Sequence, residues 1–512
     1  MKYNQDYLKI KEELRRDNEL FEDPAFSIYD EILSKNVSGQ NIQWLRPHEL
    51  CDRPLFIKDG LSRFDLDQGR LGNCWFIAAA ATLACKRSLF TRCVPEDQNF
   101  HNDYWGIFRF KFWQYGNWVE IVIDDRLPTS GGRLIFCRNR DEPNELWSAL
   151  FEKAYAKLYG GYGRLDGGRF CNALVDFTGG ISESMYIGDK NKLPGDLFDI
   201  LYKCHQMNSF MGCSIDGNYE REELINNGLY KGHAYSVTAI ELINTYNYGR
   251  LKMIRVMNPW GKAEWKGSWS DGSPLWNEVP AEERRRLEVR NSEDGEFWMA
   301  YEDWIKNFER LEIVHLEPDA FSENMLSNST KKNWRTLTYN GEWVKGKSAG
   351  GCGNSPYREL FEMNPQYPVR ISQSHGCSMI VSLMQKIDDF HIENSVSFFV
   401  HKVRAGYEDQ IGPDNKYDHG FLKRFCDSPT FINSREVSLR VQIDTPGTYV
   451  VIPSTFDPFK EGKFLLRMFA ESEGDDYYGK GAGLKDENEE IHTPQNNWFR
   501  GFPAGNQIMS IS

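Results

Sequence analysis

The sequence predicts an α+β fold, with a core of two subdomains followed by an all-β sandwich. Residues 74–84 form a continuous apolar run with the length of a buried helix. Short apolar strands separated by loops rich in Gly, Trp and Asp fill residues 211–316, and alternating strands fill most of residues 334–471. The 512 residues are enough for about three domains, which agrees with this division.

Composition excludes several classes of protein. The net charge of −13 is opposite in sign to the basic surface that nucleic acids require, so we expect no nucleic-acid partner. The eleven cysteines contain no CxxC pair, which is typical of reduced thiols rather than of a zinc ribbon or a disulfide framework. The first 16 residues are charged throughout, unlike a signal peptide, and no apolar run approaches the roughly 18 residues of a membrane span. We therefore expect a cytoplasmic protein.

The first part of the chain is predicted to be mainly helical. Residues 1–45 are expected to form an N-terminal anchor or pro-like segment, with an amphipathic helix within residues 3–22 that Pro24 ends. Residues 46–179 are assigned to the first subdomain. Its predicted elements are the helix that begins at Cys74, a hairpin of strands 106–113 and 117–124, and a helix over 146–158 that ends at glycines.

The character of the sequence changes at Thr178-Gly179-Gly180, where we place the boundary between the subdomains. Residues 180–318 form the second, β-rich subdomain, with predicted strands at 211–215, 233–242, 251–257, 296–299 and 311–316. A polar linker is expected over 319–333 and an independent sandwich over 334–471, with strands at 436–443, 447–453 and 463–470. The remaining residues, 472–512, are predicted to be a polar tail.

Cys74 has the setting of a cysteine nucleophile. Gly69 and Gly72 make a permissive turn before it, and Asn73 is a candidate N-cap. Cys74 then lies in the first turn of an apolar helix, where unpaired amides and the helix dipole favour a thiolate. The alternative is a small core cysteine, which is the role we expect for Cys85 at the far end of the helix.

A base and an orienting group for that cysteine are found in the second subdomain. His233 follows a glycine at the start of a predicted strand, and Asn258 ends the next strand, where it can fix the imidazole tautomer. Trp260 would shield their hydrogen bond from water, and Gln68 could form an oxyanion hole with the Cys74 amide. The order Cys, His, Asn, with the cysteine at a helix N-terminus, is that of a papain-like arrangement.

These residues carry a resemblance to a known family. The segments around Cys74, His233 and Asn258 resemble the three active-site blocks of the calpains, the calcium-dependent cysteine proteases. The blocks read QGRLGNCW (68–75), GHAYSV (232–237) and NPWG (258–261). The resemblance extends to PEDQNF (95–100), FRFKFWQYGNWVEIVIDDRLPT (108–129), LWSALFEKAYAKLYGGY (146–162), DFTGGIS (176–182), EDGEFWM (293–299), GEW (341–343), AGGCGN (349–354), NPQY (364–367) and GKFLLRMFAE (462–471).

The resemblance implies an activity and a site. It implies limited proteolysis of intracellular protein substrates, with an extended strand of substrate bound in the cleft between the subdomains. Cys74 would act from the first subdomain, and His233 and Asn258 from the second. Contacts with the substrate are predicted for Trp260, Gly179, Gly180 and Gly232.

Two groups of acidic residues are candidate calcium sites. The first contains Asp65 and Glu145, and the backbone carbonyl of Gly60 could join them. The second contains Glu264, Asp271, Asp294 and Glu296, and the backbone carbonyl of Ser292 could join these. Carboxylates mixed with backbone carbonyls are ligands that Ca²⁺ prefers, although such loops are more often simply solvated. The resemblance implies two calcium sites at these positions. We hypothesise that the subdomains are rotated apart without calcium and that calcium favours closure.

The chain departs from many calpains beyond residue 330, where no D-x-[DN]-x-[DN]-G loop occurs. It therefore resembles an atypical calpain without a penta-EF-hand domain, or a shortened form of a calpain, and we do not expect a small regulatory subunit as partner. The sandwich resembles the calcium- and phospholipid-binding C2 modules. Its acidic loop is weak, with only Asp388, Asp389 and Glu393, so a solvated loop and a calcium-dependent phospholipid contact that recruits the protein to membranes both stay open.

Three other functions are considered. A calcium-responsive regulatory or scaffold protein of the same family with little protease activity would not need Cys74, His233 and Asn258, and all three are present. A transglutaminase also uses Cys and His but usually has Asp as the third partner. A pure membrane-recruitment module would explain the sandwich but not residues 60–300.

Overall fold

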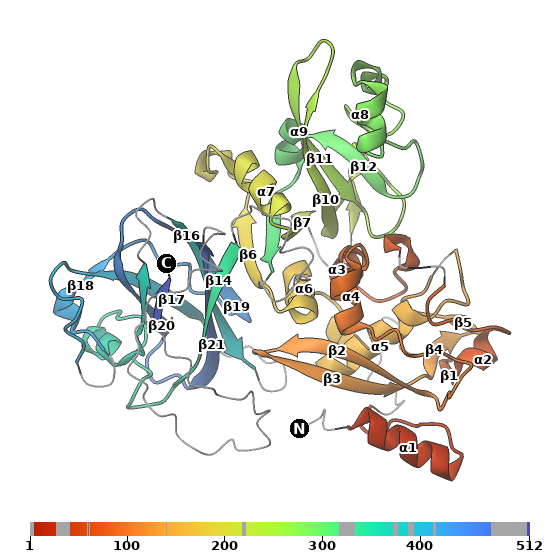
Figure 1. Cartoon of the computed structure of the whole chain (residues 1–512), viewed down its shortest axis with the longest axis horizontal. Coiled ribbons are helices and arrows are strands. Elements are labelled where there is room, and N and C mark those ends of the chain that lie inside the picture. Colours follow the sequence, from red (N-terminus) through yellow and green to blue (C-terminus); the bar gives the residue numbers. More distant parts are fainter. Residues whose placement is uncertain are drawn as a thin grey trace, which may run out of the picture. The chain divides into compact units, whose positions relative to one another are not determined.

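The structure is a computed structural model that divides into two compact units, Met1–Ser322 and Glu323–Ser512 (Figure 1). The described residues are 5–26, 41–58, 60, 62–139, 141–217, 222–316, 333–371, 377–387, 394–412, 416–472 and 509–511. The predicted linker 319–333 lies outside them except for its last residue. Within the described residues, no helix combines the length and the apolar character needed to cross a membrane.

The first subdomain surrounds the buried helix α3 (Cys74–Ala84), as predicted. Every residue from Trp75 to Ala84 is buried, which explains why this helix is apolar on all sides. An aromatic cluster that includes Phe76, Phe151 and Phe177 packs α3 against two other helices. The other elements are α1 (Tyr7–Asp17), β1 (Gln43–Leu45), α2 (Pro47–Leu50), α4 (Arg87–Cys93), β2 (Ile107–Gln114), β3 (Asn117–Asp124), β4 (Leu127–Ser130), β5 (Arg133–Leu134), α5 (Trp147–Tyr159) and α6 (Phe170–Thr178).

The predicted hairpin corresponds to β2 and β3, and the helix predicted over 146–158 corresponds to α5. The N-terminal helix is shorter than predicted. It ends at Asn18 rather than at Pro24, because Asn18 adopts a left-handed conformation (φ 55°) and its N–H caps the carbonyl of Leu14. The local cap therefore ends α1 before the proline is reached.

The second subdomain is built on a six-stranded antiparallel sheet in the order β12-β11-β10-β7-β13-β6. Its strands confirm the five predicted ones and add one before them: β6 (Ile181–Tyr186), β7 (Phe210–Ile215), β10 (His233–Asn244), β11 (Arg250–Met257), β12 (Glu296–Ala300) and β13 (Arg310–His315). Other elements are α7 (Leu197–Gln206), β8 (Glu223–Leu224), β9 (Tyr230–Lys231), α8 (Ala281–Arg286) and α9 (Tyr301–Asn307). The change from helices to strands falls between α6 and β6, at the glycine pair 179–180.

The helix α3 lies directly against β10, and buried hydroxyl groups join them. The Thr82 hydroxyl bonds with the Ser236 hydroxyl over 2.9 Å, and the Ser236 hydroxyl also donates to the Ala78 carbonyl over 3.2 Å. Both side chains are buried, at 8% and 2% exposure. The helix that begins with Cys74 is thus fixed to the strand that begins with His233.

Two lysines of α5 are buried and paired with buried aspartates. Lys153 contacts Asp124 at 2.6 Å, and Lys157 contacts Asp23 at 2.6 Å; the four side chains are at most 2% exposed. Burial lowers the pKa of each lysine, and the facing carboxylates oppose that effect. These pairs attach the extended N-terminal segment and the end of β3 to the same helix.

The second unit is a β-sandwich, as predicted. Its two sheets have the orders β14-β21-β16-β19 and β18-β17-β20-β15-β22. Apolar side chains of both sheets, such as Met379, Val381, Val400 and Val451, fill the core between them. The strands are β14 (Asn333–Trp343), β15 (Tyr367–Ile371), β16 (Cys377–Lys386), β17 (Val396–Val403), β18 (Leu422–Arg424), β19 (Glu436–Ile443), β20 (Gly447–Thr455), β21 (Gly462–Ser472) and β22 (Met509–Ile511).

Two predictions about this unit concern residues that lie wholly or mostly outside the described ranges. The acidic loop residues Asp388, Asp389 and Glu393 lie outside the described residues. So does most of the predicted polar tail, but β22 near its end pairs in parallel with β15. This strand was not predicted from the sequence.

The buried pair of Lys157 and Asp23 gives the first testable prediction. Replacing Lys157 by Met leaves the Asp23 carboxylate buried without its cation, so we expect a loss of about 3–5 kcal/mol in the free energy of unfolding. Urea denaturation followed by tryptophan fluorescence measures this loss. The control is Lys192→Met, whose lysine is 82% exposed beside Asp189 and should change stability by about 0–1 kcal/mol. Equal stability of both variants would contradict the assigned role of the buried pair.

Candidate active site

The loop before Cys74 is held by a buried carboxylate. Asn73 occupies the N-cap position of α3, as predicted, but its side chain makes no capping hydrogen bond; instead its Nδ2 donates to Glu152 Oε1 over 2.7 Å. The other oxygen of Glu152 accepts from the backbone N–H of Cys137 over 2.9 Å. Burial raises the pKa of Glu152 to about 7, although both hydrogen bonds oppose that rise. A single side chain of α5 therefore fixes the start of α3.

His233 lies at the centre of the candidate site, 1% exposed at the first position of β10. Its Nε2 is 2.9 Å from Asn258 Oδ1, and its Nδ1 is 2.8 Å from Glu222 Oε1. Cys74 Sγ, His233 Nδ1 or Nε2, and a Glu222 oxygen all lie within 4.8 Å of one another. The structure thus brings Cys74, His233 and Asn258 together, and it adds Glu222, which the sequence did not indicate.

Asn258 is oriented on both sides of its amide. Its Nδ2 donates to the carbonyls of Lys262 and Ala263 over 2.8 and 3.1 Å, so its Oδ1 must be the atom that faces the imidazole. Since Oδ1 can only accept, His233 Nε2 carries a proton and Nδ1 faces Cys74 and Glu222. Trp260 covers this arrangement, with its ring centroid 4.2 Å from that of His233.

The charges around His233 favour its protonated form. Burial alone would lower the pKa of His233, but hydrogen bonds to Cys74 and Glu222 and the negative charges of both partners outweigh burial. The result is a pKa raised to about 9. At neutral pH His233 therefore carries a positive charge beside the Cys74 sulfur.

Gln68 joins the two subdomains. Its Oε1 accepts from Trp260 Nε1 over 2.9 Å, and its Nε2 donates to the Leu71 carbonyl over 2.7 Å. Nε2 carries two hydrogens, and Leu71 takes one of them. The amide is thus held in a fixed direction beside the start of α3.

The predicted substrate residues occupy different kinds of position. Gly232 precedes His233 and is buried with φ +69°, and Trp260 lines the site. Gly179 and Gly180 are buried, and a Cβ at Gly180 would lie 2.6 Å from the His315 carbonyl oxygen. Their positions do not support contact with a substrate.

Another glycine pair lies beside the nucleophile. The N–H of Gly167 donates to the Gly72 carbonyl over 2.8 Å, and a Cβ at Gly168 would lie 2.3 Å from the Trp75 indole. Both glycines are exposed, so their backbone is open to a partner chain. The signal that could have identified them is the Gly-Gly pair at 167–168, which lies close before the pair at 179–180.

The first acidic group is compact. Asn139 Nδ2 lies 2.6 Å from Glu145 Oε2 and 3.5 Å from Asp65 Oδ1, so it bridges the two carboxylates. Burial and, more weakly, the charge of Asp65 raise the pKa of Glu145 to about 7; burial also raises the pKa of Asp65. Gly60, the third predicted member, is exposed with φ +107°. This set of hard oxygen atoms fits a calcium ion in chemistry.

The second acidic group contains three mutually repelling carboxylates. Burial, together with the charges of Asp271 and Asp294, raises the pKa of Glu264 to about 7. Burial and the charges of Asp294 and Glu296 also raise the pKa of Asp271. The loop is folded tightly, because the N–H of Ser292 donates to Asp271 over 3.1 Å and the N–H of Gly295 to Glu264 over 2.8 Å.

Glu296 has partners of its own. Its carboxylate contacts Arg63 at 2.7 Å, accepts from the Thr238 hydroxyl over 2.9 Å and lies 3.5 Å from Arg255. It is therefore engaged in ion pairs in this structure, and its role as a metal ligand stays a prediction. Arg63 lies two residues before Asp65 of the first acidic group, and Glu296 belongs to the second group. The ion pair of Arg63 and Glu296 therefore connects the segments that carry the two groups.

This fold and arrangement define a papain-like cysteine protease core followed by a β-sandwich. A family model described as calpain family cysteine protease matches residues 21–315, and one described as calpain large subunit, domain III, matches residues 339–469. The chain belongs to the calpain family.

Similar proteins agree with this membership. The chain is 41% identical to Calpain-A of Drosophila melanogaster, with 93% of this chain and 59% of that protein covered. It is 42% identical to Calpain-8 of Mus musculus and 41% identical to the Calpain-2 catalytic subunit of Homo sapiens. These matches cover 91% and 92% of this chain, and 68% and 69% of the two relatives. The chain thus spans little more than half the length of the Drosophila relative.

The contact of Glu222 with His233 gives the second prediction. Replacing Glu222 by Gln removes a negative charge that raises the pKa of His233, so we expect that pKa to fall below about 9. NMR titration of protein with ¹³C-labelled histidine, with the signal assigned by loss in His233→Gln, measures it. The matched control is Glu223→Gln, which removes an exposed carboxylate at the next position. An unchanged pKa in Glu222→Gln would contradict this electrostatic account.

Proposed function

We propose that the protein is a calcium-regulated cysteine endopeptidase that cleaves protein substrates at limited positions in the cytoplasm. The observation that carries this proposal is the geometry around His233, with Cys74 and Glu222 on the Nδ1 side and Asn258 Oδ1 2.9 Å from Nε2. Family membership supports the same chemistry. The scaffold alternative gains no support from the structure, because the arrangement needed for catalysis is assembled.

In the first half of the proposed reaction, the Cys74 thiolate attacks the carbonyl carbon of the scissile peptide bond. A C–S bond forms, and the carbonyl electron pair moves to the oxygen. The Cys74 N–H and the remaining hydrogen of Gln68 Nε2 would donate to this oxyanion. His233 gives its Nδ1 proton to the nitrogen of the leaving amine as the C–N bond breaks, which leaves a thioester on Cys74.

In the second half, water hydrolyses the thioester. His233 accepts a proton from water at Nδ1 as the hydroxyl oxygen attacks the thioester carbon. The C–S bond then breaks, the acid product leaves and the thiolate returns. Asn258 keeps Nε2 protonated throughout, so that Nδ1 always faces the sulfur. Glu222 must move from its place beside Nδ1 for a substrate to reach it.

Calcium control is proposed from the two acidic groups. Asp65, Glu145 and the Gly60 carbonyl would hold one ion, and Glu264, Asp271, Asp294 and the Ser292 carbonyl the other. A bound cation supplies positive charge that offsets the repulsion between these carboxylates. The ion pair of Arg63 and Glu296 would then connect the two loops and favour the closed subdomains, in which Cys74 meets His233.

The third prediction tests the nucleophile. Cys74→Ala should lower kcat/KM for a fluorogenic peptide by about 10³-fold or more, because the thioester can no longer form. The matched control is Cys85→Ala at the other end of the same helix, which should keep the parent rate. A casein-cleavage assay run beside an amine-incorporation assay separates protease from transglutaminase. Cleavage that survives in Cys74→Ala would remove this residue from the mechanism.

The fourth prediction tests calcium control. Glu264→Gln removes a negative charge from the second acidic group, so the calcium concentration for half-maximal peptide hydrolysis should rise by about tenfold. Glu293→Gln, an exposed residue of the same loop, should leave it unchanged. Hydrolysis at full rate in excess chelator would overturn the proposal of calcium control while leaving the protease chemistry intact.

A further inference from the structure

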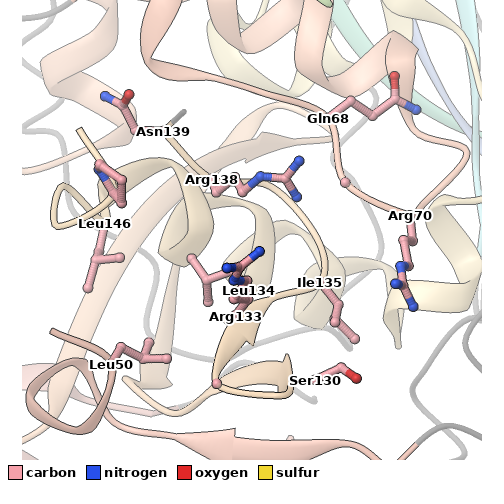
Figure 2. Close-up of a pocket in the computed structure, with 13 residues that line it drawn as sticks. Leu50, Gln68, Arg70, Ser130, Arg133, Leu134, Ile135, Arg138, Asn139 and Leu146 are labelled. Atoms are coloured by element: carbon pink, nitrogen blue, oxygen red, sulfur yellow. The ribbon is translucent and has the colours of Figure 1, made fainter. Parts of the chain in front are cut away.

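A cavity of about 680 Å³ lies beside the loop that precedes Cys74 (Figure 2). One wall of the cavity is formed by Gln68, Gly69 and Arg70, in the loop that precedes Cys74, which we call the nucleophile loop. Another wall is formed by residues of the segment 130–139. Its volume is within the range of about 300–1,000 Å³ that is typical of ligand sites. The mechanism proposed above uses only Gln68 among the residues that line it.

The two walls are joined by backbone hydrogen bonds. Asp67 and Arg138 bond to each other through N–H groups and carbonyls, over 2.8 and 3.2 Å, and the N–H of Arg70 donates to the Ile135 carbonyl over 2.9 Å. A Cβ at Gly69 would lie only 2.4 Å from the carbonyl oxygen of Ile135, so only glycine allows this approach. The segment 130–139 and the nucleophile loop are therefore held to each other by backbone hydrogen bonds.

The charged side chains that line the cavity are all arginines: Arg70, Arg133 and Arg138. Arg138 pairs with Asp67 at 2.7 Å. Arg133 is exposed, and within the described ranges no carboxylate pairs with it. Asn139 also lines the cavity, but its side-chain amide donates to Asp65 and Glu145. In a protein of net charge −13, this is a local concentration of positive charge at a concave surface.

The cavity is connected to the reacting groups through Gln68. This side chain lines the cavity and also accepts from Trp260 Nε1 over 2.9 Å, and the Trp260 ring packs against His233 with the two ring centroids 4.2 Å apart. A substrate chain whose scissile bond lies between Cys74 and His233 therefore passes close to the cavity. A substrate side chain on one side of the scissile bond can therefore enter the cavity.

We propose that this cavity is a specificity site that binds an acidic side chain, Asp or Glu, of the substrate polypeptide. Arg133 would supply the guanidinium that pairs with the carboxylate, and Arg70 and Arg138 would add positive charge around it. Arginine suits this role because its planar donors match the two oxygens of a carboxylate. The inference rests on the proposed protease function, which it extends to the choice of substrate.

The experiment compares fluorogenic peptides that carry a single Glu or Gln at each of the three positions on either side of the scissile bond. For the parent protein, Glu should raise kcat/KM over Gln by about tenfold at one position or at neighbouring positions on one side. Arg133→Glu should abolish or reverse that ratio, and Arg133→Gln should abolish it. Arg250→Glu, the same charge change at an exposed site on β11, should keep it.

A second readout separates this inference from the proposed function. Fluorescence anisotropy measures binding of the best Glu peptide and its Gln form to Cys74→Ala, with and without Arg133→Glu. If the parent cleaves peptides with no preference for Glu, or with a preference that Arg133→Glu leaves intact, the specificity site is wrong and the protease function stands. If the parent cleaves nothing but binding shows the Arg133-dependent preference, the protease function is wrong and the acidic-peptide site stands.

Discussion

The packing of α3 on β10 is the constraint on which the candidate site depends. Cys74 and His233 are far apart in the sequence, and each is the first residue of its element. Their approach therefore requires that the helix and the strand lie against each other, and the buried hydroxyls of Thr82 and Ser236 join them at that contact. Because a buried hydroxyl without a partner costs about 1–3 kcal/mol, the contact favours a single alignment of the two elements. The alignment brings the first residue of α3, on one subdomain, close to the first residue of β10, on the other.

Around this contact, buried charges hold the loops. Glu152 of α5 fixes the turn before Cys74, and Lys153 and Lys157 on the same helix fix the end of β3 and the N-terminal segment. On the other side, Arg63 crosses between the subdomains to Glu296. One network thus keeps the nucleophile loop in place, and a separate ion pair connects the subdomains beside the acidic groups. Because the contacts that hold the loop before Cys74 are distinct from the ion pair of Arg63 and Glu296, cation binding could alter the cleft without unfolding that loop.

Much of this could be predicted from the sequence, because local patterns determine it. The apolar run after Cys74, the hairpin and the strands of the second subdomain follow from hydrophobic periodicity and turn residues. The partners of Asn73 and the place of Glu222 could not be predicted in this way, because Glu152 is 79 residues from Asn73 and Glu222 approaches His233 only through the fold of a loop. The burial of Gly179 and the arginine pairs of Glu296 are likewise tertiary effects, invisible in a single sequence. The grouping of Cys74, His233 and Asn258 could be predicted from the residue types and their places at the ends of predicted elements, and the family resemblance agreed with it.

On the proposed function, Cys74 is the one reactive thiol among the eleven cysteines. The most direct measurement is labelling with a peptidyl epoxide, with the modified residue found by peptide mass spectrometry in calcium and in chelator. We expect rapid labelling of Cys74 alone in calcium, and slow labelling in chelator or in His233→Ala. Labelling spread over other cysteines, or labelling of Cys74 at the same rate without His233, would contradict it.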